Sequence, residues 1–167
     1  MSPEQQLNTP PLQYKKAIPI ASPVSGECAL LSHCNDPLIN TGAWGPGATI
    51  ITSTSKIIAP FNATIIKVDA LDYAIELKST FGLKCRIQYG FDTAKFHGEQ
   101  FSTELKSGDR IGATQPLFSV NTAWLKQHSI DTVCTMTILN AQALIGVLPN
   151  HQKYIEAGKD PIFTLYI

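Results

Sequence analysis

The feature that most limits the fold of this chain is a succession of short β-rich segments separated by turn residues. Branched and aromatic residues, which favour strands, are common in these segments. Turn residues interrupt them, as at Gly45-Pro46-Gly47, Ser107-Gly108-Asp109 and Pro149-Asn150. Many short strands in one chain predict a sandwich or a barrel. The expected strands are Ile18–Ser22, Ala48–Thr52, Thr64–Asp69, Tyr73–Lys78, Lys84–Tyr89, Arg110–Ala113, Leu117–Val120, Thr132–Leu139 and Ile162–Ile167.

Polar and apolar residues alternate most clearly over Lys84–Tyr89. Successive side chains of a strand point to opposite faces, so we expect one face in the core and the other at the surface. The expected core set is Cys85, Ile87 and Tyr89, and the expected surface set is Lys84, Arg86 and Gln88.

Helical signals are few. Asn121 is a suitable cap for a short helix over Thr122–His128, and Asp36–Asn40 is long enough for one turn. Residues 1–16 are polar and contain Pro10-Pro11, which breaks any helical apolar face, so we expect a flexible arm without a membrane tether. Residues 17–167 are then a single β domain.

Charge and hydropathy exclude several classes of protein. Lysine plus arginine and aspartate plus glutamate each number 13, and this balance argues against nucleic acid as a partner. No apolar run approaches the roughly 20 residues that span a bilayer, so no membrane insertion is expected. The N-terminus lacks the basic and apolar regions of a secretory signal, which predicts a cytoplasmic protein.

The cysteines are expected to be reduced thiols, with Cys85 and Cys134 as small buried residues. Cys28, His33 and Cys34 are close enough in sequence to suggest zinc. A structural zinc site needs a fourth ligand and a second spaced pair, so we predict no metal site and no cofactor.

A set of motifs then resembles one family in order and spacing from about Ile18 to Asn140. They are Ile20-Ala21-Ser22-Pro23-Val24-Ser25-Gly26-Glu27, Asp36-Pro37-Leu38-Ile39, Gly45-Pro46-Gly47-Ala48, Ile58-Ala59-Pro60, Ala63-Thr64-Ile65, Gly90-Phe91-Asp92-Thr93, Gly98-Glu99-Gln100-Phe101, Gly108-Asp109-Arg110-Ile111 and Leu117-Phe118. Together they resemble the glucose-type enzyme IIA domain of the bacterial phosphoenolpyruvate-dependent sugar phosphotransferase system.

The resemblance implies an antiparallel β-sandwich, or a barrel-like hybrid of that fold, with short helical turns. Members of the family accept a phosphoryl group from the histidine phosphocarrier protein on one histidine, supported by a second. They pass it to a sugar permease, and unphosphorylated members bind permeases and metabolic enzymes. The resemblance therefore implies protein partners of these two kinds.

The two histidine positions of the family correspond here to Gln88, before Gly90-Phe91-Asp92-Thr93, and to Tyr73, before Ala74-Ile75. A glutamine amide nitrogen has no free lone pair, whereas a neutral imidazole has one and titrates near pH 6.5. A tyrosine phenol, with a pKa of about 10, stays protonated at pH 7.

We therefore predict no phosphoryl transfer at this site and no catalytic residue there. Gln88 and Tyr73 reflect either drift, with the two side chains hydrogen-bonded across strands in a shallow surface dip, or a repurposed binding patch. The first hypothesis is a degenerate enzyme IIA-like regulator or adaptor. The alternative is an active phosphocarrier that uses a non-standard acceptor such as His97 or Tyr73.

The family surrounds its active site with apolar residues that dock the phosphocarrier. Leu38, Ile39 and Trp44 keep that character, whereas Asp69 and Arg86 stand where large apolar side chains are usual. Charge at the centre of an interface carries a desolvation cost, so docking of the usual carrier is in doubt. The candidate binding residues are Leu38, Ile39, Trp44, Asp69, Tyr73, Arg86, Gln88 and Asp92.

Three further expectations concern these side chains. Asp69 and Arg86 either pair with each other or meet the charges of a partner. Asp92 is expected to cap its turn. His97 is expected to be an exposed loop residue. The chain lacks the hairpin lysine of lipoyl and biotinyl carriers and the histidine set of zinc peptidases with a similar fold.

Overall fold

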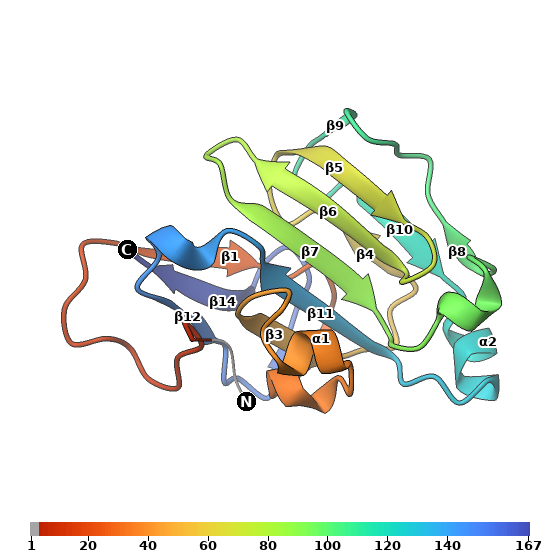
Figure 1. The fold of residues 1–167 in the computed structure, drawn as a ribbon, viewed down its shortest axis with the longest axis horizontal. Helices are drawn as coiled ribbons and strands as arrows, with labels where there is room; N and C mark the ends of the chain where they lie inside the picture. Colours follow the sequence, from red (N-terminus) through yellow and green to blue (C-terminus); the bar gives the residue numbers. More distant parts are fainter. Residues whose placement is uncertain (1–3) are drawn as a thin grey trace.

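The structure, a computed structural model, describes residues 4–167 as three antiparallel sheets (Figure 1). The largest has the strand order β13-β2-β3-β11-β7-β6-β5-β9, and the two smaller ones are β1-β14-β12 and β4-β10-β8. The strands are β1 (Ala17–Ala21), β2 (Gly26–Ala29), β3 (Gly47–Ile51), β4 (Lys56–Ile58), β5 (Ala63–Asp69), β6 (Ala74–Ser79), β7 (Lys84–Tyr89), β8 (Phe101–Ser102), β9 (Arg110–Ile111), β10 (Pro116–Val120), β11 (Val133–Ile138), β12 (Gly146–Pro149), β13 (Tyr154–Ile155) and β14 (Pro161–Tyr166).

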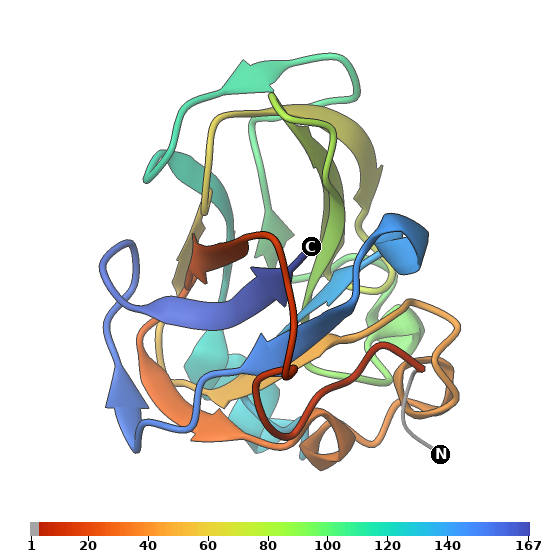
Figure 2. The same ribbon diagram turned by 90° about the vertical axis from the view of Figure 1, so that its left-hand side faces the viewer.

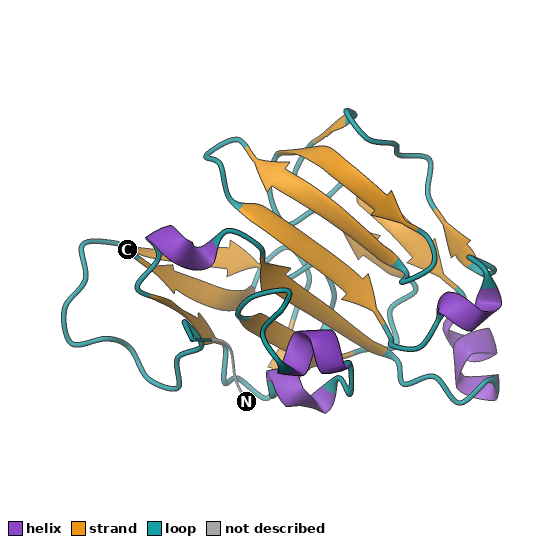
Figure 3. Ribbon diagram, in the orientation of Figure 1, coloured by secondary structure: helices purple, strands orange, loops and turns teal. Residues whose placement is uncertain are grey.

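The helical segments are short and lie at the ends and edges of the sheets (Figure 3). They are η1 (Leu31–His33), α1 (Pro37–Asn40), η2 (Ala94–Phe96), α2 (Thr122–Gln127) and η3 (Ala141–Ala143). Within residues 4–167, no helix has the length and apolar character required to cross a membrane.

The prediction of an antiparallel all-β fold with short helical turns is confirmed, and the sheets do not close into a barrel. The sheets enclose one large apolar core to which strands from all parts of the chain contribute. Figure 2 shows β1 (red) beside β14 (blue), so the two ends of the chain share one sheet. The predicted cap at Asn121 is also confirmed, since Trp124 N–H donates to Asn121 Oδ1 at 3.0 Å. The turn predicted over Asp36–Asn40 is α1, where Leu38 N–H donates to Asp36 Oδ1 at 2.9 Å.

Strand β7 departs from the simple two-face pattern. Cys85, Ile87 and Tyr89 are buried as predicted, but Arg86 and Gln88 are only 1% and 3% exposed. The prediction of a surface face for these two residues is therefore wrong. The reason is tertiary: β7 is central in its sheet, and Trp44 and Asp36, from the segment around α1, contact its second face.

Parts of the predicted N-terminal arm contact the domain. Residues 5–7 lie beside β12, and the ring of Tyr14 packs edge-on against that of Tyr166, with centroids 4.8 Å apart. Residues 1–3 of the predicted arm lie outside the described residues. The flexibility of the arm stays a prediction, as does its boundary with the domain at residue 17.

Candidate functional site

The candidate site lies on the face of β7 covered by α1 and by the loop that follows it. Arg86 and Gln88 share this face because they are two residues apart on one strand. Pro37 opens α1 and Asp36 caps it, so the helix begins at a defined point beside β7. Trp44 comes from the connection between α1 and β3.

Gln88 is held by its amide nitrogen. Its Nε2 donates to Asp36 Oδ2 at 3.0 Å and to the carbonyl oxygen of Gly90 at 3.1 Å. Because both acceptors are oxygens, they determine the orientation of the amide group. Asp36 therefore joins two elements: one carboxylate oxygen caps α1 and the other accepts from β7.

Arg86 is the buried centre of an ion cluster whose carboxylates are partly exposed. Its guanidinium donates to Glu76 Oε2 at 2.8 Å, to Asp72 Oδ2 at 3.0 Å and to Asp69 Oδ2 at 3.3 Å. The Trp44 ring covers it, with the guanidinium carbon 4.2 Å from the ring centroid. The predicted pairing of Asp69 with Arg86 is thus confirmed, and a role in meeting a partner's charges stays a prediction.

Negative charge exceeds positive charge in this cluster. Asp72 contacts Arg86, yet its pKa is raised above the ordinary aspartate value, first by burial and then by the Asp69 carboxylate. The attraction of Arg86 opposes these two effects without cancelling them.

Tyr73 occupies a different environment from Gln88. Its side chain is fully buried, its ring lies 5.5 Å from that of Phe101, and its hydroxyl donates to the carbonyl oxygen of Glu99. Burial, with a smaller effect from the Glu99 carboxylate, raises the pKa of this phenol. Tyr73 and Gln88 are therefore not joined by a side-chain hydrogen bond in a surface dip, as the drift interpretation supposed.

The other candidate residues differ in exposure. Both Leu38 and Ile39 belong to α1; Leu38 is 48% exposed, whereas Ile39 is buried. Asp92 is exposed and accepts from Lys95 Nζ at 3.1 Å, and within the described residues its carboxylate makes no hydrogen bond to the backbone of its own turn, so the predicted capping is wrong. His97 is an exposed loop residue, as predicted, in a left-handed backbone conformation.

Four buried side-chain atoms in residues 4–167 have no hydrogen-bond partner, and all four belong to this site. They are Asn40 Oδ1, Trp44 Nε1, Arg86 Nε and Gln88 Oε1. Buried polar atoms are normally paired, so a concentration of unpaired ones marks a place where the structure does not optimise its own stability.

Three important carboxylates were missed as site residues in the sequence. Asp36 appeared only in a motif, although an aspartate directly before a helix-opening proline signals a cap. Glu76 lies opposite Arg86 in the β6–β7 register, a relation that sequence alone does not reveal. Asp72 joins them from the turn between β5 and β6.

Cys28, His33 and Cys34 do not form a metal centre. Cys34 is buried, with its Sγ 3.9 Å from the carbonyl oxygen of Gly90, whereas His33 is exposed. In the described part of the chain no three histidine, cysteine, aspartate or glutamate side chains are grouped to bind a metal ion.

Comparison with known proteins identifies the family. The model described as phosphoenolpyruvate-dependent sugar phosphotransferase system, EIIA 1, matches residues 18–144. This chain belongs to that family. The predicted resemblance to glucose-type enzyme IIA domains is confirmed.

Two relatives of this EIIA domain come from Staphylococcus carnosus. The PTS system glucoside-specific EIICBA component is 33% identical over 141 residues, which are 84% of this chain and 20% of the relative. The PTS system glucose-specific EIICBA component is 29% identical over 121 residues, 72% of this chain and 18% of the relative. The chain thus spans about a fifth of the length of these relatives.

The fold is also that of a solved structure, glucose permease IIA from Mycoplasma capricolum. The TM-score is 0.72 at 17% sequence identity, and the match covers 90% of this chain and 96% of the other.

Proposed function

We propose that this EIIA-type domain carries no phosphoryl group at the family position and acts by binding a protein, as a regulator or adaptor in the cytoplasm. The observation that carries the proposal is the state of Gln88. Its amide nitrogen donates to Asp36 and Gly90, and an amide nitrogen is no nucleophile at neutral pH. Tyr73, at the second family position, has a buried hydroxyl that is already hydrogen-bonded.

A binding role is supported by what surrounds Gln88. The unpaired polar atoms of Asn40, Trp44 and Gln88 belong to α1, to the connection after it and to β7, and α1 also carries the exposed apolar side chain of Leu38. Interfaces commonly combine apolar anchors with polar groups that find partners on association. By the family resemblance, the partner is a component of the phosphotransferase system, such as a sugar permease, or a metabolic enzyme.

The test of the chemistry is incubation of the purified chain with phosphoenolpyruvate, enzyme I and the phosphocarrier, followed by intact mass measurement. We expect no gain of about 80 Da, the mass of one phosphoryl group. A stable gain on the wild-type chain would overturn the proposal. Fragmentation would then place the group on His97, Tyr73 or another residue and establish the alternative of a non-standard phosphocarrier.

Two variants, Gln88→His alone and Gln88→His combined with Tyr73→His, test whether the domain can still dock the phosphocarrier and accept a phosphoryl group. Transfer to either variant shows that carrier docking survives and that the missing imidazole alone prevents relay. Failure of both variants, with circular dichroism showing folded chains, makes Asp69 and the buried Arg86 beneath the docking surface the next positions to change.

The test of binding compares two exposed apolar residues. Leu38 lies at the site, and Phe81, 56% exposed, lies in the turn between β6 and β7, at the opposite end of β7 from Gln88. Partners captured from native cell extract should be lost with Leu38→Asp and kept with Phe81→Asp. Equal capture by both variants would show that the partner binds elsewhere.

A further inference from the structure

The N-terminal segment of the chain occupies the corner between β3 and β12, far from Gln88 in sequence. Leu7 N–H donates to the carbonyl oxygen of Val147 at 2.9 Å, and Val147 N–H donates to that of Gln5 at 2.9 Å. These bonds form a parallel bridge between Gln6 and Val147. Since β12 is an edge strand of its sheet, residues 5–7 act as a short added strand.

The side chain of Gln6 makes a second pair of bonds, to the other sheet. Its Nε2 donates to the carbonyl oxygen of Gly47 at 2.7 Å, and Gly47 N–H donates to its Oε1 at 2.9 Å. Gly47 is open to this contact because β2 pairs with β3 only as far as Ala29 opposite Thr49. The primary amide of Gln6 thus pairs with the end of β3 as a neighbouring peptide group would.

Leu7 fits over a residue that has no side chain. A Cβ added to Gly146 would lie 2.4 Å from Leu7 Cγ, closer than real atoms approach. The leucine therefore fills the space that any other residue at position 146 would take. The corner consequently selects a side chain as well as an extended backbone.

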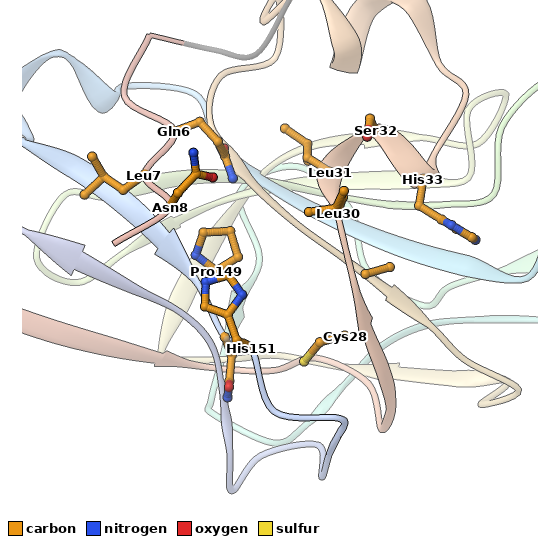
Figure 4. A pocket seen from close by; sticks show the side chains of 12 residues that line it. Gln6, Leu7, Asn8, Cys28, Leu30, Leu31, Ser32, His33, Pro149 and His151 are labelled. Carbon is orange, nitrogen blue, oxygen red and sulfur yellow. The ribbon is translucent and has the colours of Figure 1, made fainter. Parts of the chain in front are cut away.

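An open cleft of about 620 Å³ lies beside the docked segment (Figure 4). Gln6, Leu7 and Asn8 line one side of it, residues 30–33 line the other, and Pro149 and His151 lie between them. The described residues around it include no aspartate, glutamate, lysine or arginine. The cleft leaves room for further side chains of a longer, uncharged peptide.

We propose that the corner of Gly47, Gly146 and Val147 is a docking site for an extended peptide segment with glutamine followed by leucine, and that Gln5–Leu7 is its occupant within the chain. Recognition rests on two backbone bonds to β12, the amide pairing to β3 and the leucine over Gly146, a combination typical of strand addition. A partner that presents such a segment competes with the arm. The arm has an advantage over a free partner because it is joined to the domain, and short flexible linkers give effective concentrations in the millimolar range.

The test uses the full chain and two glutamines of the arm. Gln6→Ala removes the amide pairing, and Gln13→Ala changes an exposed glutamine as the matched control. Amide hydrogen exchange, followed by NMR, should become about tenfold or more faster at Val147 and Gly47 in Gln6→Ala, since both amides donate to the arm. Exchange at these amides in Gln13→Ala should match the wild type.

Adding a synthetic peptide with the sequence of residues 4–9 at millimolar concentration should restore protection in Gln6→Ala. The same peptide with alanine at the place of Gln6 should not. Unchanged exchange in Gln6→Ala would overturn the role of Gln6. Faster exchange that the peptide fails to slow, in a chain that circular dichroism shows to be folded, would overturn the docking site and leave the arm as a structural clamp. Neither result depends on the chemistry at Gln88.

Discussion

At the scale of single residues, the candidate site is defined by a buried arginine. Arg86 is 1% exposed, and such a charge is tolerated in a core only when it is paired. Glu76, Asp72 and Asp69 supply the pairing and Trp44 covers the guanidinium. An ion cluster therefore lies next to Gln88, and a partner whose docking surface is apolar would not be complementary to it.

Replacing Arg86 with methionine should lower the free energy of unfolding by about 3 kcal/mol at pH 7, because it leaves the carboxylates without a buried partner. The deficit should shrink as the pH falls towards 4 and below, since protonated carboxyls need no counter-charge. Urea unfolding at several pH values measures both the loss of stability at pH 7 and its change with pH. Lys67→Met is the control: Lys67 is 57% exposed and 4.0 Å from Asp69, so the change should cost under about 1 kcal/mol. A deficit in Arg86→Met that is constant with pH would contradict this account.

Asp72 offers a test of opposite sign. Its pKa is raised in the folded chain by burial and by Asp69, so the fold binds this proton more tightly than the unfolded chain does. Protonation of Asp72 therefore stabilises the fold as the pH falls through that raised pKa, and this contribution is absent at neutral pH. The wild type should gain stability relative to Asp72→Asn between pH 7 and pH 4 in parallel urea titrations. A relative loss would mean that the pairing with Arg86 outweighs burial.

At the scale of elements, the connection from α1 to β3 positions Trp44 over β7. Gly45 follows Trp44 with a φ of +90°, and a Cβ there would lie 1.9 Å from the carbonyl oxygen of Ile138 in β11. Two demands therefore meet at Gly45: a backbone conformation suited to glycine and a close approach to a neighbouring strand.

Two glycine variants separate these demands. Gly82 has a φ of +93° and no atom within 4 Å of an added Cβ, so Gly82→Ala should cost only the conformational strain of about 1–2 kcal/mol. Gly45→Ala should cost clearly more in thermal or urea unfolding, because the β11 backbone must also move. It should also shift the fluorescence of Trp44. Equal costs would show that the contact with Ile138 is relieved without effect.

At the scale of the whole molecule, β14 holds the two ends of the chain together. It pairs with β1 on one side and with β12 on the other, and it places Ile162, Phe163 and Leu165 in the core. β1 and β14 are more than a hundred residues apart in the sequence, so no local interaction can take the place of their pairing.

Deleting residues 161–167 should abolish cooperative unfolding, as measured by near-ultraviolet circular dichroism and urea titration. Phe163→Leu is the control, since it keeps the strand and removes only part of one buried ring. It should retain a cooperative transition with stability lower by about 1–2 kcal/mol. A cooperative transition in the truncated chain would show that the β1-β14-β12 sheet is dispensable.

Local patterns were sufficient for the class of fold, for the alternating core positions of β7 and for the cap at Asn121, because strand alternation and helix capping act over a few residues. The order of short motifs was likewise sufficient for the family. The sequence did not predict β2, β4, β8, β12 and β13, since these strands have only two to four residues each, too few to show a period.

Packing between distant segments settled the rest. Gln88 and Arg86 alternate like surface residues but are covered by Trp44, Asp36 and carboxylates from two neighbouring strands and their turn. In the sequence, Gln6 is one polar residue of an arm among others, and only the fold places it beside Gly47. Burial and pairing of this kind depend on which strands become neighbours. Strands pair through main-chain N–H and C=O groups, which every residue except proline carries in full, so the pairing leaves little signal in the sequence.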